Sequence, residues 1–324
     1  MTEPTRHRTA HTQVVQAPPD VLFDLVADVA RWPVIFGPSL HAEVLEDDGH
    51  QQRFRLWALV NDEVATWTSR RTLDRPGRRI VFEQERSSPP VASMGGEWRV
   101  EARSGGVSEL VLTHRFSAVD DAPDALDWIT TAVDRNSHDE LEALRRLAEL
   151  GPTPAGLVLD FEDVVPLDCT PAAAYDFVAA ADLWPERLPH VGRVALHSPR
   201  PDVQDLEMDT VTPDGHTHTT RSIRLLFPGE RIVYKQLVPP ALLLGHSGSW
   251  SFGPGADGDS DVDGGGTVVV SRHVVAIDPS AIPGVLGAGT TLADARRHVH
   301  DALSANSRAT LRHAAAFTAG ERVT

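Results

Sequence analysis

Apolar and polar residues alternate along five segments in the first half of the chain, as in strands that bury one face. A shorter segment of the same kind, Thr12–Val15, precedes them. The five segments are Arg53–Val60, Ala65–Leu73, Arg79–Arg86, Gly96–Ala102 and Glu109–Ala118. Strands that follow one another so closely predict an antiparallel sheet, because short turns can join such neighbours.

Two helices are predicted around these strands. Residues 124–149 carry apolar side chains three and four positions apart, which indicates one long amphipathic helix. A shorter helix is expected before the sheet, and it should end at Trp32-Pro33, since proline disfavours helical geometry in the residue before it. The predicted fold class is α+β, with a curved antiparallel sheet that wraps around the long C-terminal helix and leaves a cavity between them.

The second half of the chain repeats the first. Phe23-Asp24-Leu25-Val26 corresponds to Tyr175-Asp176-Phe177-Val178 at an offset of 152 residues, and Trp32-Pro33 corresponds to Trp184-Pro185 at the same offset. The offset grows to 170 near the end, because a polar, glycine-rich insertion occupies 253–266. We therefore predict two tandem domains, 1–150 and 151–324, with a linker at 148–156 and a second long helix at 290–318.

Composition narrows the possible functions. The 324-residue chain has a formal net charge of −16, which disfavours nucleic acid and anionic membranes as partners. It has no apolar run long enough to span a membrane. Its one cysteine, Cys169, cannot form an internal disulfide, so a reducing cytoplasm is the expected location.

Three motifs carry a family resemblance: ADVARWPVIF at 27–36, ATWTSRR at 65–71 and MGGEWRV at 94–100. With them the chain resembles the polyketide cyclase/dehydrase branch of the START-like (Bet v 1-like) helix-grip superfamily. Two such domains in tandem resemble the di-domain aromatase/cyclases of bacterial type II polyketide synthases. The resemblance implies a poly-β-ketone substrate on an acyl carrier protein, C7–C12 aldol closure of the first ring, and dehydration. It also implies that a ketoreductase often reduces C9 beforehand.

Candidate residues in the first domain lie on two predicted strands. Trp67, Ser69 and Arg71 alternate, so they share one strand face. The resemblance implies that this face is inward, that Arg71 polarises an enolate or carbonyl oxygen, and that Ser69 relays a proton. The alternative is that Arg71 is a solvated rim residue. We expect cavity-wall or core positions for a further three residues: Trp32, Met94 and Trp98.

The second domain offers a different set of candidates. At the 152 offset Arg221 falls on Ser69 and His246 falls on Met94, so we expect an inward Arg/His acid–base pair. The alternative for His246 is a hydrogen-bonded turn residue. The remaining candidates are Tyr234 as a proton donor, Trp250 as a wall residue, and Asn136 and Asn306, which either reach the cavities from the long helices or bond locally.

No cofactor is predicted. The chain contains no phosphate-binding glycine motif and no nucleophile elbow, and His216 and the acidic run at 257–263 lack the spacing of metal ligands. Two function classes remain, a cofactor-independent polyketide cyclase/dehydratase and a non-catalytic carrier of hydrophobic ligands. For the enzyme, the acyl carrier protein is expected to dock on an arginine cluster formed by Arg70, Arg75, Arg78 and Arg79.

Overall fold

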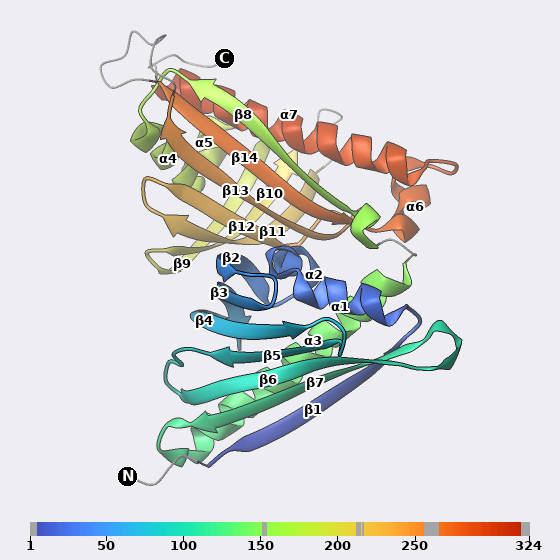
Figure 1. Ribbon diagram of the computed structural model, residues 1–324. Coiled ribbons are helices and arrows are strands. Elements are labelled where there is room, and N and C mark those ends of the chain that lie inside the picture. Colours follow the sequence, from blue (N-terminus) through green and yellow to red (C-terminus); the bar gives the residue numbers. More distant parts are fainter. Residues whose placement is uncertain (1–4, 151–153, 212–214, 216, 256–265, 319–324) are drawn as a thin grey trace. The chain divides into compact units, whose positions relative to one another are not determined.

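The protein consists of two compact units, Met1–Gly156 and Leu157–Thr324 (Figure 1). A computed structural model describes residues 5–150, 154–211, 215, 217–255 and 266–318. The sequence placed the domain boundary slightly earlier, after residue 150. His216 and most of the predicted insertion at 253–266 lie outside the described residues.

The first unit is a seven-stranded antiparallel sheet in the order β1-β7-β6-β5-β4-β3-β2. Its strands are β1 His7–Val15, β2 Ser39–Asp47, β3 Gln51–Val60, β4 Glu63–Asp74, β5 Arg79–Gln84, β6 Val91–Ala102 and β7 Ser108–Ala118. Five of these match the five alternating segments, and β1 extends the shorter one. Strand β2 was not predicted, because its burial does not alternate regularly.

The second unit has the same strand order, β8-β14-β13-β12-β11-β10-β9. Its strands are β8 Val158–Leu167, β9 Val191–Arg200, β10 Val203–Val211, β11 Thr217–Phe227, β12 Arg231–Val238, β13 Leu243–Pro254 and β14 Thr267–Ile277. Two sheets of identical topology in one chain are what a tandem duplication produces.

A long helix closes each unit. Helix α3, Pro123–Glu149, packs against β1 and β7, and helix α7, Leu292–Thr318, packs against β8 and β14. Figure 1 shows each of these helices running beside its own sheet. The α+β helix-grip architecture predicted from the sequence is confirmed. Among the described residues no helix combines the length and apolar character needed to cross a membrane.

The Trp-Pro pairs begin helices, contrary to the prediction that they end them. Helix α1, Pro19–Ala27, stops several residues earlier, and Trp32-Pro33 opens the short helix α2, Trp32–Ile35. In the second unit, helix α4, Pro171–Ala179, is followed by α5, Trp184–Arg187, in the same way. Proline is well tolerated in a first helical turn, where its missing N–H would have no partner. One further short helix, α6, Ile282–Leu286, precedes α7.

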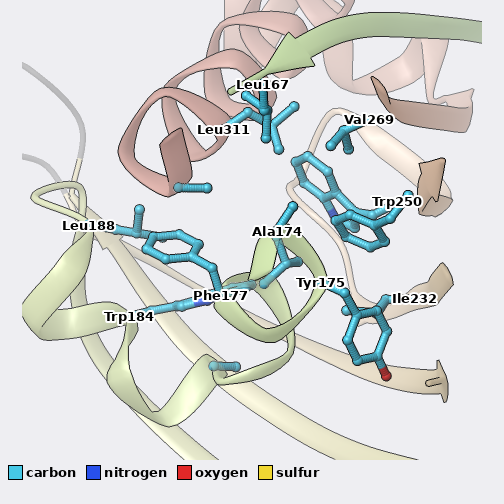
Figure 2. Packing of buried hydrophobic residues seen from close by; sticks show 14 of the residues in the cluster. Leu167, Ala174, Tyr175, Phe177, Trp184, Leu188, Ile232, Trp250, Val269 and Leu311 are labelled. Atoms are coloured by element: carbon cyan, nitrogen blue, oxygen red, sulfur yellow. The ribbon is translucent and has the colours of Figure 1, made fainter. Parts of the chain in front are cut away.

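The apolar core of the second unit lies where α4, the sheet and α7 meet (Figure 2). Phe177 from α4 and Leu311 from α7 are almost fully buried, and Trp250 from β13 is 9% exposed. Trp250 therefore packs in the apolar core, whereas the sequence analysis expected it in a cavity wall.

Candidate active site

A cavity of about 230 Å³ lies inside the first unit, between the sheet and helix α3. Most of its lining is aromatic and aliphatic, and a few polar groups are spaced around it. The polar lining residues are Ser39, Thr66, Ser69, Gln84, Ser88, His114, Asn136, Ser137 and Glu140. An apolar hollow with a few placed polar groups is the usual form of a small-molecule site.

Most candidates from the first domain line this cavity. Trp32, Trp67, Met94 and Trp98 form parts of its wall. Ser69 is buried and reaches the cavity from β4, opposite Gln84 in the register of β4 and β5. Asn136 lines the cavity from α3, and its side-chain amide donates a hydrogen bond to the Leu59 carbonyl at 3.2 Å.

Arg71 does not line the cavity, contrary to expectation, although it is only 3% exposed. Its guanidinium donates to the backbone carbonyls of Val26, at 2.9 Å, and Ala27, at the end of α1. It also donates to the Gln52 side chain at 2.7 Å, and it lies over the Trp32 ring at 5.3 Å. Burial lowers the pKa of Arg71 to about 10, so it remains a cation at neutral pH. Both earlier interpretations are therefore wrong. Arg71 is a buried cation that fixes the end of α1.

Two titratable groups that the sequence analysis overlooked do line the cavity. Glu140 reaches it from α3, and burial raises the pKa of its carboxyl group to about 8. His114 reaches it from β7, and burial lowers the pKa of its imidazole to about 4. Between these values both groups are uncharged, so the cavity holds a neutral carboxylic acid and a neutral imidazole. Such a pair can donate and accept protons without the cost of a buried charge.

The surroundings of His114 orient its ring. The ring lies edge-on to Phe82 with centroids 5.6 Å apart, and its Nδ1 lies 3.5 Å from the hydroxyl oxygen of Ser137. The positive charge of a protonated His11 would lower its pKa further, and the carboxylate of Asp134 opposes that effect. His11 and Asp134 themselves form a contact of 3.0 Å.

In the second unit Arg221 points outward, so the prediction that it faces a cavity is wrong. Its side chain is 49% exposed and pairs with Asp205 at 2.7 Å. The turn between β11 and β12, residues 228–230, is one residue shorter than the turn between β4 and β5, residues 75–78. The offset along β11 is therefore 153, and Ser222, opposite Gln236 as Ser69 is opposite Gln84, is the counterpart of Ser69. An error of one residue in the offset moves a strand residue to the other face.

Arg224 is the true counterpart of Arg71. It lies opposite Tyr234 as Arg71 lies opposite Phe82, and it donates to the Val178 carbonyl and the Gln204 side chain, both at 2.6 Å. Burial lowers its pKa to about 10 as well. The sequence analysis missed Arg224 because the shorter turn changes the offset along β11 from 152 to 153.

The interior of the second unit holds a chain of hydrogen-bonding side chains. The Tyr234 hydroxyl lies 2.9 Å from Nδ1 of His273 and 3.4 Å from Nε2 of His246. Nε2 of His273 lies 2.7 Å from the Ser307 hydroxyl, and Nδ1 of His246 lies 3.0 Å from Oε1 of Gln236. Burial lowers the pKa of both imidazoles and raises that of the Tyr234 phenol.

This hydrogen-bonded network differs from the first unit at two positions, where Phe82 stands in place of Tyr234 and Met94 in place of His246. His273 and His114 both lie opposite a β-strand glycine, Gly248 and Gly96 respectively, so they are counterparts. In the second unit each ring nitrogen of His273 has a partner inside the protein. His246 is a buried strand residue in β13, and therefore not the turn residue that was its alternative.

Asn306 is exposed, so the expectation that it reaches a cavity is wrong. The neighbouring Ser307 is the residue of α7 that points inward, and it is 2% exposed. The predicted docking arginines are exposed or half-buried, but each pairs with a carboxylate of its own unit. The pairs are Arg70–Glu85, Arg75–Asp24, Arg78–Asp20 and Arg79–Glu97.

Known proteins share both the sequence and the two-unit structure. Residues 6–149 match the family described as polyketide cyclase/dehydrase and lipid transport. The chain is 50% identical to the actinorhodin polyketide synthase bifunctional cyclase/dehydratase of Streptomyces coelicolor, over 98% of both chains. The chain belongs to the polyketide cyclase/dehydratase family. A second family member is the granaticin polyketide synthase bifunctional cyclase/dehydratase of Streptomyces violaceoruber, which is 48% identical over 96% of this chain and 94% of that protein.

Solved structures of the family have the same architecture. The di-domain ARO/CYC BexL from the BE-7585A biosynthetic pathway is 45% identical and superposes with a TM-score of 0.78, covering 98% of this chain and all of that one. The di-domain ARO/CYC StfQ from the steffimycin pathway is 36% identical, with a TM-score of 0.76 over 96% of this chain and 98% of that one. Membership of the family accounts for the duplication that the sequence revealed.

Proposed function

We propose that the protein folds a carrier-bound poly-β-ketone, closes its first ring between C7 and C12, and dehydrates that ring to an aromatic one. The observation that carries this proposal is the cavity of the first unit, which holds the Glu140 carboxyl group and the His114 imidazole in an apolar enclosure. The coarser activity, a polyketide cyclase/dehydratase, follows from family membership.

The aldol step needs a base and an acid. The methylene protons of a β-diketone are already acidic, so a neutral imidazole suffices to take a proton from C12. The resulting carbanion attacks the C7 carbonyl carbon, and the oxygen that becomes a hydroxyl takes the proton of a carboxylic acid. We assign the first role to His114 and the second to Glu140, because only their uncharged forms can act in this way.

Dehydration reverses the two roles. After ring closure His114 carries an extra proton and Glu140 is a carboxylate. The imidazolium donates its proton to the C7 hydroxyl as it leaves as water, and the carboxylate takes a proton from a neighbouring ring carbon. Both groups then return to their starting states. A ring that was reduced at C9 must lose a second water before it is aromatic. Glu140 protonates the C9 hydroxyl as it leaves, His114 takes a proton from an adjacent ring carbon, and return of that proton to the Glu140 carboxylate resets the pair. One acid–base pair can therefore serve both halves of a cyclase/dehydratase reaction.

The remaining lining selects a chain conformation. Trp32, Trp67 and Trp98 present flat apolar surfaces on which a folded polyketide can pack. Ser69 and Asn136 offer hydrogen bonds to its carbonyl groups, so we assign them to substrate positioning. Holding one reactive conformer of a flexible chain removes much of the entropic barrier to ring closure.

The second unit takes no direct part in this scheme. Tyr234 and His246, the candidates there, bond to each other and to His273, so we assign them to the stability of the second core. As partners we propose an acyl carrier protein that bears the substrate, and a ketoreductase that reduces C9 before ring closure. We place the protein in the cytoplasm, which fits its one cysteine, Cys169, being a free buried thiol.

The test is reconstitution with a minimal type II polyketide synthase, with and without a ketoreductase. The expected result is a shift from spontaneous products to a C7–C12 aromatic ring, detected by mass and absorbance, and a larger shift when the ketoreductase is present. A non-catalytic carrier, the alternative function, would return the same products as a mixture that lacks the protein.

A further inference from the structure

A polar depression lies beside the cavity of the first unit. It measures about 470 Å³ and is separate from the cavity, although the two share Thr66, Trp67 and Ser88 in their walls. Its remaining lining residues are Arg53, Thr68, Glu85 and Arg86. A group bound in the depression would therefore sit next to the cavity wall.

The charge of the depression is positive although the whole chain carries −16. Its one carboxylate, Glu85, accepts hydrogen bonds from Arg53, at 2.9 Å, and from Arg70. Arg53 also pairs with Glu46 at 3.3 Å, so these two guanidinium groups are matched by two carboxylates. Arg86 is exposed, and no described residue forms an ion pair with it, so it gives the depression its net positive charge.

Hydroxyl groups complete the lining. Thr66 and Thr68 come from β4, and Ser88 comes from the loop between β5 and β6. Guanidinium and hydroxyl groups together are the side chains that bind phosphate oxygens in proteins. Carboxylates of a protein surface would also be attracted, but the hydroxyl groups favour a ligand with several acceptor oxygens at one centre.

We propose that this depression binds the phosphate of the phosphopantetheine arm on which a carrier protein holds its acyl chain. The inference rests on the proposed function, because that function requires a thioester-bound chain to enter the cavity. With its phosphate beside Arg86 and Arg53, the arm passes along Thr66 and Trp67, which also line the cavity, and so reaches the cavity. This placement leaves the arginines Arg75 and Arg78 to their ion pairs with α1.

The experiment measures binding of small probes to the full-length protein by calorimetry. Phosphopantetheine, pantetheine and inorganic phosphate are titrated separately at low ionic strength. We expect phosphopantetheine to bind about tenfold more tightly than either of the other two, since it alone has both the phosphate and the arm. In Arg86→Gln the affinity for phosphopantetheine should fall about tenfold, to that for pantetheine. In the unsubstituted protein the difference in affinity between the two probes should decrease with added salt.

Arg115→Gln is the matched control. Arg115 is an exposed arginine of β7 in the same unit and does not line the depression, so its removal changes the net charge equally. It should leave phosphopantetheine binding within about twofold of the unsubstituted protein. Equal affinities for phosphopantetheine and pantetheine would overturn the proposal, and so would equal effects of the two substitutions. Inorganic phosphate that binds as tightly as phosphopantetheine would overturn the assignment to the arm.

The two proposals fail in different ways. Probe binding involves no ring closure, so its outcome does not depend on whether the protein is a C7–C12 cyclase. A protein that binds phosphopantetheine as described but gives no aromatic product in reconstitution would contradict only the proposed function. A protein that gives the aromatic product but binds phosphopantetheine and pantetheine with equal affinity would contradict only the phosphate site.

Discussion

Arg71 of the first unit and Arg224 of the second occupy the same position and bind the same piece of backbone. Each is opposite the aromatic residue of the next strand, Phe82 or Tyr234, and each donates to a carbonyl near the end of the first helix of its unit, Val26 or Val178. The duplicated fold thus keeps a buried cation as an anchor for the element that covers one end of the sheet.

The first prediction concerns these two arginines. Arg71→Met or Arg224→Met should lower the free energy of unfolding by about 2–4 kcal/mol, because helix-end carbonyls would remain buried without a donor. The measurement is urea denaturation followed by circular dichroism. Arg221→Met is the control, and its exposed ion pair with Asp205 should cost at most about 1 kcal/mol. Similar losses for Arg71→Met and Arg221→Met would contradict the anchoring role.

Much of the fold could be predicted from the sequence, because strand alternation and helix spacing depend on burial alone. The long helices at 124–149 and 290–318 lie within two residues of the observed α3 and α7. The prediction of elements failed where the pattern of apolar and polar residues was weak. Strand β2 has no regular alternation, and Trp32-Pro33 can both follow one helix and begin another.

The site was harder to predict, for two physical reasons. A constant offset assumes turns of equal length, and the turn after β11 is one residue shorter than the turn after β4, so the offset of 152 selected Arg221 and hid Arg224. His114 and Glu140 belong to none of the motifs quoted above. Their signal was present, however. His114 shares strand parity with the buried Leu110 and Leu112, and Glu140 lies beside Leu141 on the apolar side of α3.

The second prediction is a pH dependence set by the cavity pair. Glu140 acts as an acid only while protonated, so activity should fall as the pH rises through about 8, the pKa of its carboxyl group. His114 acts as a base only while neutral, so activity should fall as the pH drops through about 4. In Glu140→Gln the rate should drop about 100-fold and the alkaline limb should disappear. Asp139→Asn, the same replacement of a carboxyl group by an amide at an exposed neighbour, should keep both limbs. Its alkaline limb should move to lower pH, because the Asp139 carboxylate helps to raise the pKa of Glu140. An alkaline limb that survives in Glu140→Gln would exclude Glu140 as the acid.

The third prediction tests why a glycine faces each aromatic ring. A Cβ atom at Gly96 would overlap the Thr113 carbonyl oxygen and the Phe82 ring. Gly96→Ala should therefore cost about 1–3 kcal/mol in the free energy of unfolding, measured by urea denaturation. Gly253→Ala, in strand β13 with no atom within 4 Å of the new Cβ, should be nearly neutral. Equal effects would show that the close approach at Gly96 does not matter.

The fourth prediction separates the two interiors. Tyr234→Phe gives the second unit the ring that the first has at Phe82, and it removes the hydroxyl that contacts His273 and His246. We expect a loss of about 0.5–1.5 kcal/mol in stability, as for one hydrogen bond, and a turnover within about threefold of the unsubstituted protein. His246→Met, which copies Met94, should behave in the same way. A tenfold loss of turnover at full folding in either variant would place chemistry in the second unit.

The central claim is that the cavity of the first unit carries the reaction. The most direct measurement compares Glu140→Gln with Tyr234→Phe in the reconstituted synthase with ketoreductase, with products quantified by mass and absorbance. The account predicts that Glu140→Gln yields the spontaneous products of a mixture without the protein, while Tyr234→Phe still yields the C7–C12 aromatic ring. Normal aromatic product from Glu140→Gln, or its loss in Tyr234→Phe alone, would contradict the account.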